Sequence, residues 1–232
     1  MIVRERGDLG GTMECIRQHD HAALSAALAD AWVLGGVLDE DVRFAVVNHD
    51  VAWVGLDQRA RLGADRSAHT FLDHPLQAKY DAHRAGVDLV ETGSTYAAVL
   101  CSGHYARFAS MLDDECSRAY LDHEQRRQQR LWPQLNAVQR ARVEHDLAVL
   151  RLLDALSLFV CCNRPGEVTW PFHRDGFRLG DQRLGASWVD TATVRLDPDP
   201  LDAPVHCAYR AYRWDEDGAL IDPVRYEVCF SG

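Results

Sequence analysis

One carboxylate constrains the fold more than any other feature of the chain. The segment 136–162 is predicted to be a long helix with the most continuous apolar stripe in the sequence, and Asp154 lies inside that stripe. A buried carboxylate is costly unless a metal ion or a partner group compensates its charge. The fold is therefore expected to bring compensating groups to this helix from other parts of the chain.

Residues of the required kind recur at helix-sized intervals. The series consists of His21, the adjacent pair His49-Asp50, His74, His104 and finally Asp154. Imidazole suits iron and zinc, while a carboxylate can bridge two metals or complete a coordination shell. Because the members fall on successive predicted helices that can converge in a bundle, the series predicts a centre that binds two metal ions.

Each histidine also has an ordinary interpretation, as a helix cap or a hydrogen-bonded core residue. His19 is an alternative to His21, although a helix turns neighbours two residues apart to different faces. His74, which lies between an aspartate cap and a proline, is also consistent with a solvated turn residue, and without it the site would be mononuclear or asymmetric. The remaining histidines without matching partners are interpreted as ordinary: His69, His83, His123, His145, His173 and His206.

The pattern changes from helical to strand-like near residue 163. Helices are predicted over 20–34, 40–49, 73–92, 95–112, 114–131 and 136–162, after an extended lead-in over 1–18 and around a loop over 54–72. Strands are predicted over 191–196, 205–214 and 224–230. We therefore predict a mainly α protein, with a helical metal-binding domain over 1–163 and a small C-terminal antiparallel β appendage over 164–232.

Composition excludes several classes of partner. The net charge of −10 argues against nucleic-acid binding, and no apolar run is long enough for a membrane span. The charged N-terminus does not resemble a signal peptide, and the seven cysteines lack paired CxxC spacing. These features predict a cytoplasmic protein with reduced thiols and a small-molecule substrate, and they leave open a homodimer.

The order of the series resembles the binuclear branch of the HD-domain superfamily, helical metalloenzymes named after the adjacent His-Asp pair. The resemblance covers residues 15–160 and implies four basic ligands, two further histidines for a second metal, and one bridging carboxylate. The resemblance implies that the four basic ligands are His21, His49, Asp50 and Asp154. It implies that His74 and His104 hold the second metal and that Asp50 bridges the two. The sequence around these residues also resembles a bacterial family of HD-like proteins. The segments that carry this resemblance are DHA at 20–22, FLDHPL at 71–76, CSGH at 101–104 and LSLFVCC at 156–162.

The resemblance implies two reaction classes. Most binuclear members hydrolyse phosphate esters, whereas a smaller group, including myo-inositol oxygenase and phosphonate-cleaving oxygenases, holds two irons and uses O₂. Many members carry a Lys or His three residues after the HD aspartate, but here Trp53 offers an aromatic wall and no charge. We predict a mixed-valent Fe(II)/Fe(III) oxygenase that acts with O₂ on a small polar molecule. A metal-dependent phosphohydrolase is the second alternative, and a non-catalytic metal-stabilised binding protein is the third.

Four residues outside the ligand set are candidates for contact with the substrate. Trp53 is expected to shape the pocket, and Glu14 to act as a gate or a substrate contact. Arg107 and Lys79 each lie about one helical turn from a candidate histidine ligand, so either can pair with a substrate carboxylate. The ordinary interpretation of each charge is a solvent-facing side chain.

Overall fold

The structure, a computed structural model, describes residues 1–6, 12–60, 68–215, 217–221 and 223–232. Its α-helices are α1 (Gln18–Asp30), α2 (Glu40–Asn48), α3 (Val54–Gln58), α4 (Leu76–Gly93), α5 (Thr95–Ala109), α6 (Glu115–Leu131) and α7 (Ala137–Cys162). Its short 3-10 helices are η2 (Val51–Trp53), η3 (Trp132–Gln134) and η4 (Pro171–His173). Its strands are β1 (Ile2–Arg6), β2 (Thr12–Ile16), β3 (Phe177–Leu179), β4 (Gln182–Trp188), β5 (Thr193–Asp197), β6 (Val205–Ala211) and β7 (Val224–Ser231).

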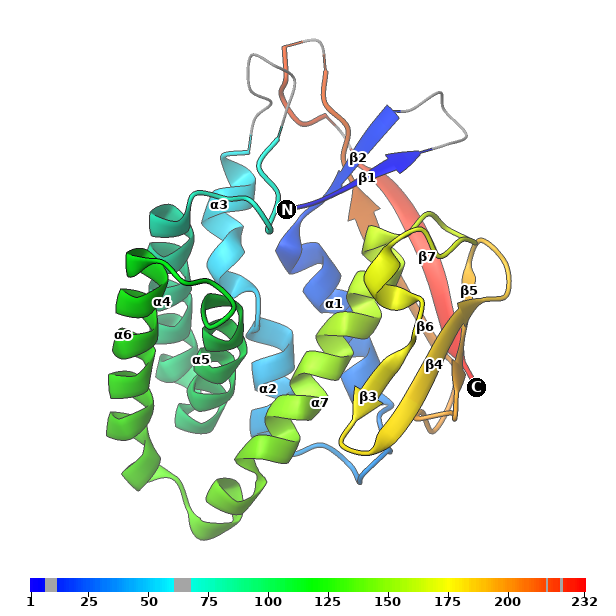
Figure 1. The fold of residues 1–232 in the computed structure, drawn as a ribbon. Helices are drawn as coiled ribbons and strands as arrows, with labels where there is room; N and C mark the ends of the chain where they lie inside the picture. Colours follow the sequence, from blue (N-terminus) through cyan, green and yellow to red (C-terminus); the bar gives the residue numbers. More distant parts are fainter. Residues whose placement is uncertain (7–11, 61–67, 216, 222) are drawn as a thin grey trace.

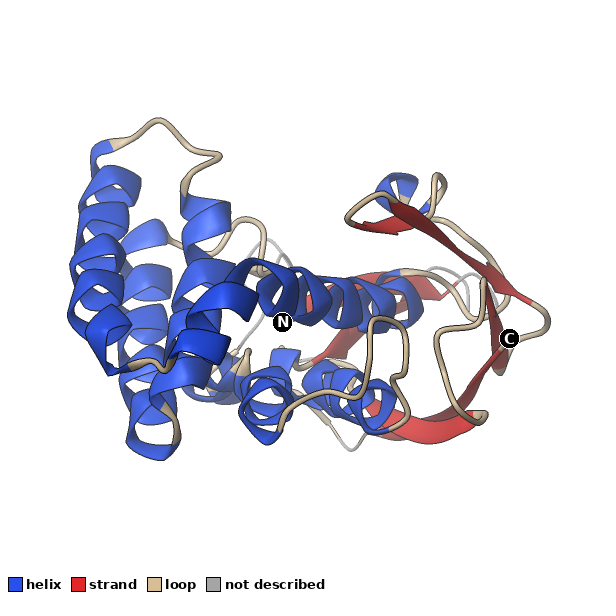
Figure 2. Ribbon diagram, turned by 90° about the horizontal axis from the view of Figure 1, so that it is seen from below, coloured by secondary structure: helices blue, strands red, loops and turns tan. Residues whose placement is uncertain are grey.

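Helices α1 and α7 lie between a group of helices and a curved sheet (Figure 1). On one side α5 contacts α2, α4, α6 and α7, and on the other α1 contacts β6 while α7 contacts β3. Figure 2 shows the strands curving around the side of the molecule away from α4 and α6. Because α1 and α7 pack on both sides, their residues are buried over much of their length.

The predicted fold class is wrong. About 52% of the residues are helical and 20% are in strands, which is a mixed composition and not a mainly α one. The larger sheet has five strands in the order β3-β4-β5-β7-β6, and it is mixed because β7 inserts beside β5 and runs parallel to it. Its inner face shares one hydrophobic core with α1 and α7, including Leu24, Leu156, Val194 and Phe230. The domain boundary at residue 163 stays a prediction.

The N-terminal residues and the predicted loop carry more regular structure than expected. The extended lead-in forms the hairpin of β1 and β2, and the backbone of Cys15 bonds that of Tyr212 next to β6. Part of the region 54–72, predicted as a loop, is instead helical, because it begins with α3. Residues 61–67 of the same prediction lie outside the described residues.

All six predicted helices are present. Side-chain caps start several of them: Asp39 accepts from the Asp41 amide, Ser94 from the Ala97 amide, and Asn136 forms a capping box with Gln139. Helix α1 ends four residues before the predicted boundary of 34, because the following segment turns to pair with residues 200–202. Among the described residues, no helix is both long and apolar enough to cross a membrane.

One glycine fixes how closely α4 approaches the segment after α2. A Cβ at Gly86 would lie 2.6 Å from the Cβ of Ala52 in η2, so only glycine fits at this contact. The close approach places the inner face of α4 beside Trp53. The ring of His83, one turn before Gly86, lies 5.6 Å from the Trp53 ring.

Candidate metal centre

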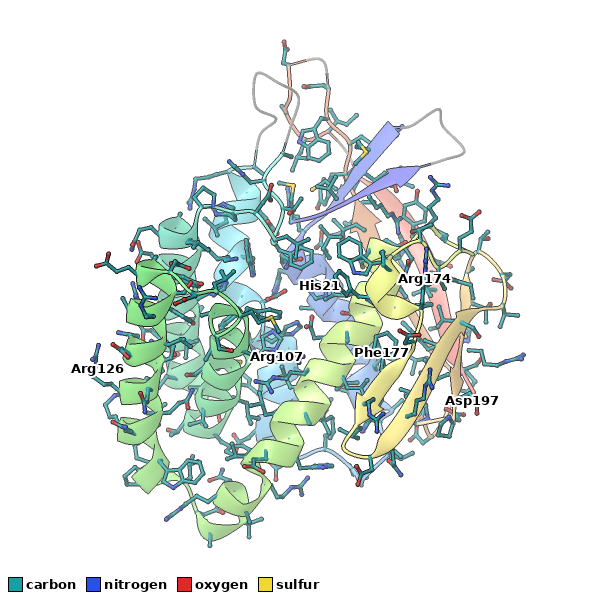
Figure 3. All side chains as sticks on the ribbon, viewed as in Figure 1. His21, Arg107, Arg126, Arg174, Phe177 and Asp197 are labelled. Atoms are coloured by element: carbon teal, nitrogen blue, oxygen red, sulfur yellow. The ribbon has the colours of Figure 1, made fainter. Side chains whose placement is uncertain are left out.

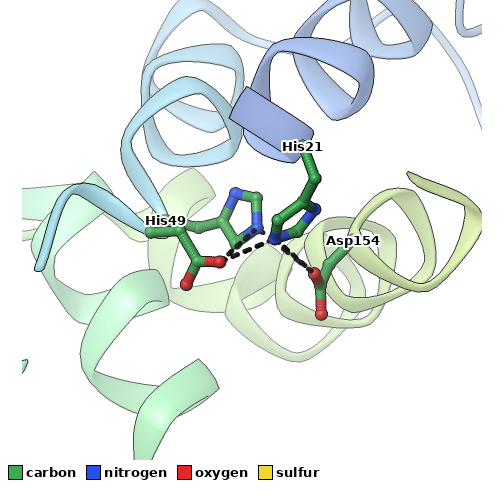
Figure 4. Close-up of side chains that lie close together, drawn as sticks. His21, His49 and Asp154 are labelled. Atoms are coloured by element: carbon green, nitrogen blue, oxygen red, sulfur yellow. Dashed lines mark hydrogen bonds and ion pairs between the residues drawn. The ribbon is translucent and has the colours of Figure 1, made fainter. Parts of the chain in front are cut away.

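Four of the predicted ligands meet in the interior. One ligand atom from each of His21, His49, Asp50 and Asp154 lies within 4.8 Å of the others, and all four residues are buried. They come from α1, from the two residues that end α2 and precede η2, and from α7. Figure 4 shows His21, His49 and Asp154 pointing toward one another from these elements.

The two histidines of this cluster present the same ring nitrogen to the carboxylates. His49 Nδ1 lies 2.7 Å from the Val46 carbonyl, which can only accept, so Nδ1 carries the hydrogen. The Ser157 hydroxyl donates to the Asp154 carbonyl, so it accepts from His21 Nδ1 at 2.7 Å. Each Nε2 therefore faces the carboxylates of the cluster, and a metal ion that replaced the proton between them would bind this nitrogen while Nδ1 keeps the ring oriented.

The spacing of the cluster suits a metal ion. His21 Nε2 lies 2.7 Å from Asp50 Oδ2 and 3.9 Å from Asp154 Oδ1. His49 Nε2 lies 3.3 Å from Asp154 Oδ1 and 3.9 Å from Asp50 Oδ2. A metal about 2.1 Å from each of several ligands separates neighbouring ligand atoms by about 3 Å. The four side chains can therefore enclose one ion after small adjustments.

The electrostatics of the cluster favour charged carboxylates. Burial by itself raises the pKa of a carboxylic acid, but the His49 charge and the His21 hydrogen bond outweigh it and hold the pKa of Asp50 well below its usual range. Burial also opposes a charge on His49, yet Asp50 and Asp154 together raise the pKa of His49 to about 9. Two carboxylates thus attract positive charge to one buried point, and a metal cation can supply it.

Two further buried histidines have unused ring nitrogens: His104 adjoins the cluster, and His83 lines the pocket that opens on it. His104 Nε2 lies 3.9 Å from Asp154 Oδ2, and its ring centroid is 5.5 Å from that of His49. Among the described residues, its Nδ1 has no hydrogen-bond partner. His83 is 3% exposed, and neither of its ring nitrogens has a partner in the described part of the chain. Buried polar atoms without partners are rare, and a second metal ion could bind one ring nitrogen of each histidine.

His74 is not among the lining residues of the pocket that opens on the cluster, whereas His83 is. His74 precedes α4, is only partly buried, and packs its ring edge against Trp53 at 5.8 Å. His83 lies within α4, stacked on Tyr105 with ring centroids 4.0 Å apart. The missed signal is helical periodicity: position 83 shares the buried face of α4 with Tyr80, Val87 and Val90.

A pocket of about 190 Å³ opens on the cluster from one side. Its lining includes two histidines and two carboxylates that are all buried, Asp50, His83, His104 and Asp154, and we call this part of the lining its inner end. The remainder of the lining is mostly apolar or aromatic: Trp53, Phe71, Leu72, Tyr105, Phe108, Met111, Leu112 and Leu158, with Gln18 and Lys79. Trp53 therefore lies where the sequence predicted it. Lys79 also lines the pocket, where burial lowers the pKa of its ammonium group.

Two other predicted contacts lie elsewhere. Glu14 is fully buried, where it pairs with Arg4 at 3.2 Å and accepts a hydrogen bond from Tyr226 at 2.8 Å, and it does not line the pocket. Arg107 is exposed on α5 and lines a different cavity, beside Arg151. Both placements disfavour direct contact with a substrate at the metals.

The two histidines at the inner end of the pocket should make the metal-free protein acid-sensitive. Burial lowers the pKa of His83 to about 3 and of His104 to about 4, against about 6.5 in an unfolded chain. Below about pH 6.5 the unfolded chain therefore binds protons that the folded chain does not, so stability falls as the pH drops toward about 4. Each histidine contributes a slope of about 1.4 kcal/mol per pH unit in this window.

Replacing His83 with phenylalanine should remove its share of that slope. Urea unfolding of the chelator-treated protein at a series of pH values measures it. The control His206→Phe changes an exposed histidine of β6 and should leave the slope as it is in the wild type. Equal slopes in the wild type and His83→Phe would show that His83 is not held neutral in the folded protein.

Comparison with known proteins assigns the chain to a family, but it does not indicate which reaction the protein catalyses. No curated protein and no solved structure matches it. One family model, described as "Protein of unknown function (DUF3891)", matches residues 1–213. Since this range covers most of the 232 residues, the chain belongs to that family.

Proposed function

We propose that this protein is an oxygenase with a centre of two metal ions at the inner end of the pocket. His21, His49, Asp50 and Asp154 would hold the first ion, and His83, His104 and the shared carboxylate of Asp50 would hold the second. Support comes from the convergence of buried imidazoles and carboxylates, and from the unpartnered nitrogens of His83 and His104. The imidazole-rich set suits iron, as Fe(II)/Fe(III), and iron supplies redox chemistry with O₂.

The lining of the pocket is the observation that favours oxidation. Among the described lining residues, Lys79 is the sole cation, and most of the others are apolar. Enzymes that transfer phosphoryl groups place several cationic groups around the charged oxygens, whereas an apolar, water-poor pocket protects a reactive oxidation from side reactions. Phosphoester hydrolysis is the second candidate, and the position of Lys79 is the observation in its favour.

The chain's own residues can bind and orient a small substrate in this pocket. Lys79 is 7% exposed, and its ammonium group, 3.4 Å from the Phe71 carbonyl, can pair with an anionic group. Trp53 forms an aromatic wall. The Tyr105 hydroxyl is buried without a partner among the described residues, and burial raises its pKa well above the usual value, so it stays protonated and can donate a hydrogen bond.

Anaerobic incubation followed by exposure to O₂ tests the reaction. Reduced, iron-loaded protein is mixed with a panel of small molecules that carry a hydroxyl and an anionic group. We expect no product before O₂ is admitted, then O₂ uptake with formation of an oxidised product, and neither in Asp154→Asn. Exposed Asp81→Asn, on α4, is the matched control and should behave as wild type. Hydrolysis of a phosphoester without O₂ uptake would instead establish the second candidate.

A further inference from the structure

A second cavity, of about 340 Å³, gathers arginines on an acidic protein. Arg107 of α5, Arg151 of α7 and Arg178 of β3 line it together with Phe177. The net charge of the chain is −10, yet no carboxylate is among the lining residues in the described part of the structure. Figure 3 shows Arg107 and Phe177 on either side of α7.

The three guanidinium groups have no anionic partner among the residues that the structure describes. Within the described residues, none of them forms an ion pair. Arg151 is held in place because it donates to the Gly103 carbonyl at 2.7 Å, while its buried Nε has no partner. Two causes lower the pKa of Arg151: its burial is the larger, and the positive charge of Arg107 is the smaller. The two cations therefore repel each other across the cavity. An anion between them would relieve this repulsion.

We infer that this cavity binds a phosphate-type dianion, either free phosphate or the phosphate of a small phosphorylated molecule. Guanidinium groups present planar pairs of donors that match phosphate oxygens, and such charge-assisted bonds are the strong ones. The Phe177 ring offers an apolar wall for an organic group attached to the phosphate. The cavity shares no lining residue with the pocket at the metal centre, so the inference does not depend on the proposed oxidation.

Calorimetric titration with inorganic phosphate tests the inference on the full chain. At mildly alkaline pH and constant ionic strength, phosphate should bind to the wild type and chloride should not. The double variant Arg107→Gln/Arg178→Gln should lose affinity by about tenfold or more, because it removes two of the three guanidinium groups that would pair with the phosphate. Both side chains are exposed, so the variant is expected to fold.

Two controls separate this cavity from other anion sites. Arg126→Gln removes an exposed arginine of α6 and should leave phosphate affinity unchanged. Asp50→Asn disrupts the metal centre. Phosphate bound by a metal ion would be lost in this variant, whereas phosphate bound in the arginine cavity should keep its affinity. Wild-type affinity in the double variant, or loss of binding in Asp50→Asn, would overturn the inference, as would equal heats from phosphate and chloride.

The source of the phosphate group is distinguished by a second probe. Phenylphosphonate carries the same dianionic head and adds one aromatic ring. Tighter binding than inorganic phosphate, reduced again in Phe177→Ala, would assign the cavity to a small phosphorylated molecule. Equal or weaker binding would assign it to free phosphate.

Discussion

Replacing Asp50 with asparagine is expected to release both metal ions. Asp50 Oδ2 lies 2.7 Å from His21 Nε2 and 3.9 Å from His49 Nε2, and Asp50 also lines the pocket beside His83 and His104. Asparagine keeps the shape but loses the charge that lets one carboxylate serve two cations. The loss of metal affinity should exceed a factor of about 10–100, which is the typical loss when a group that only orients a metal ligand is replaced.

Metal content per chain, measured by mass spectrometry after purification without added metal, gives the result directly. We expect two ions in the wild type and none in Asp50→Asn. Asp81→Asn, which removes an exposed carboxylate of α4, should retain both ions. A variant that lacks Asp50 but keeps its full metal content would exclude the shared carboxylate.

Replacing His83 with alanine is expected to remove one of the two metal ions, while His74→Ala should remove neither. His83 is buried at the inner end of the pocket with both ring nitrogens unpartnered among the described residues. His74 lies partly exposed before α4, with its Nδ1 3.5 Å from the Pro75 carbonyl. Because His21 and His49 are untouched, the first ion should remain in both variants.

The two variants form a matched pair on one helix and its lead-in. Metal content together with the electron paramagnetic resonance signal of the partially oxidised iron protein reports the outcome, since a coupled mixed-valent signal requires both ions. We expect the coupled signal to persist in His74→Ala and to disappear in His83→Ala. The reverse result would restore His74 as the ligand.

The first part of the cluster could be predicted because its residues carry strong local signals. Asp154 is conspicuous as a charge within an apolar helix, and His49-Asp50 ends a helix with clear acidic residues in its first turn. The apolar stripe of the last helix places Asp154 in the interior, and tertiary packing then brings His21, His49 and Asp50 to it. The structure gathers these four residues at one point.

The remaining errors arise from packing that local patterns do not contain. The order of the series favours position 74, and it does not show that position 83 lies on the buried face of α4, so the choice between them stays a prediction. Asp146 of α7 shows the same effect, because it is 1% exposed and accepts a hydrogen bond from Tyr96 at 2.6 Å, a partner that local sequence does not indicate. The parallel pairing of β5 with β7 depends on which strands become neighbours across the sheet, and strand propensity does not specify that.

A crystal structure of the metal-loaded protein, with anomalous data collected at the iron edge, tests the metal centre most directly. We expect one anomalous peak within about 2.2 Å of the Nε2 atoms of His21 and His49, and a second beside His83 and His104. Asp50 should lie between the two peaks. A fully occupied, iron-treated crystal with no anomalous peak at this buried cluster would contradict the assignment of a metal centre.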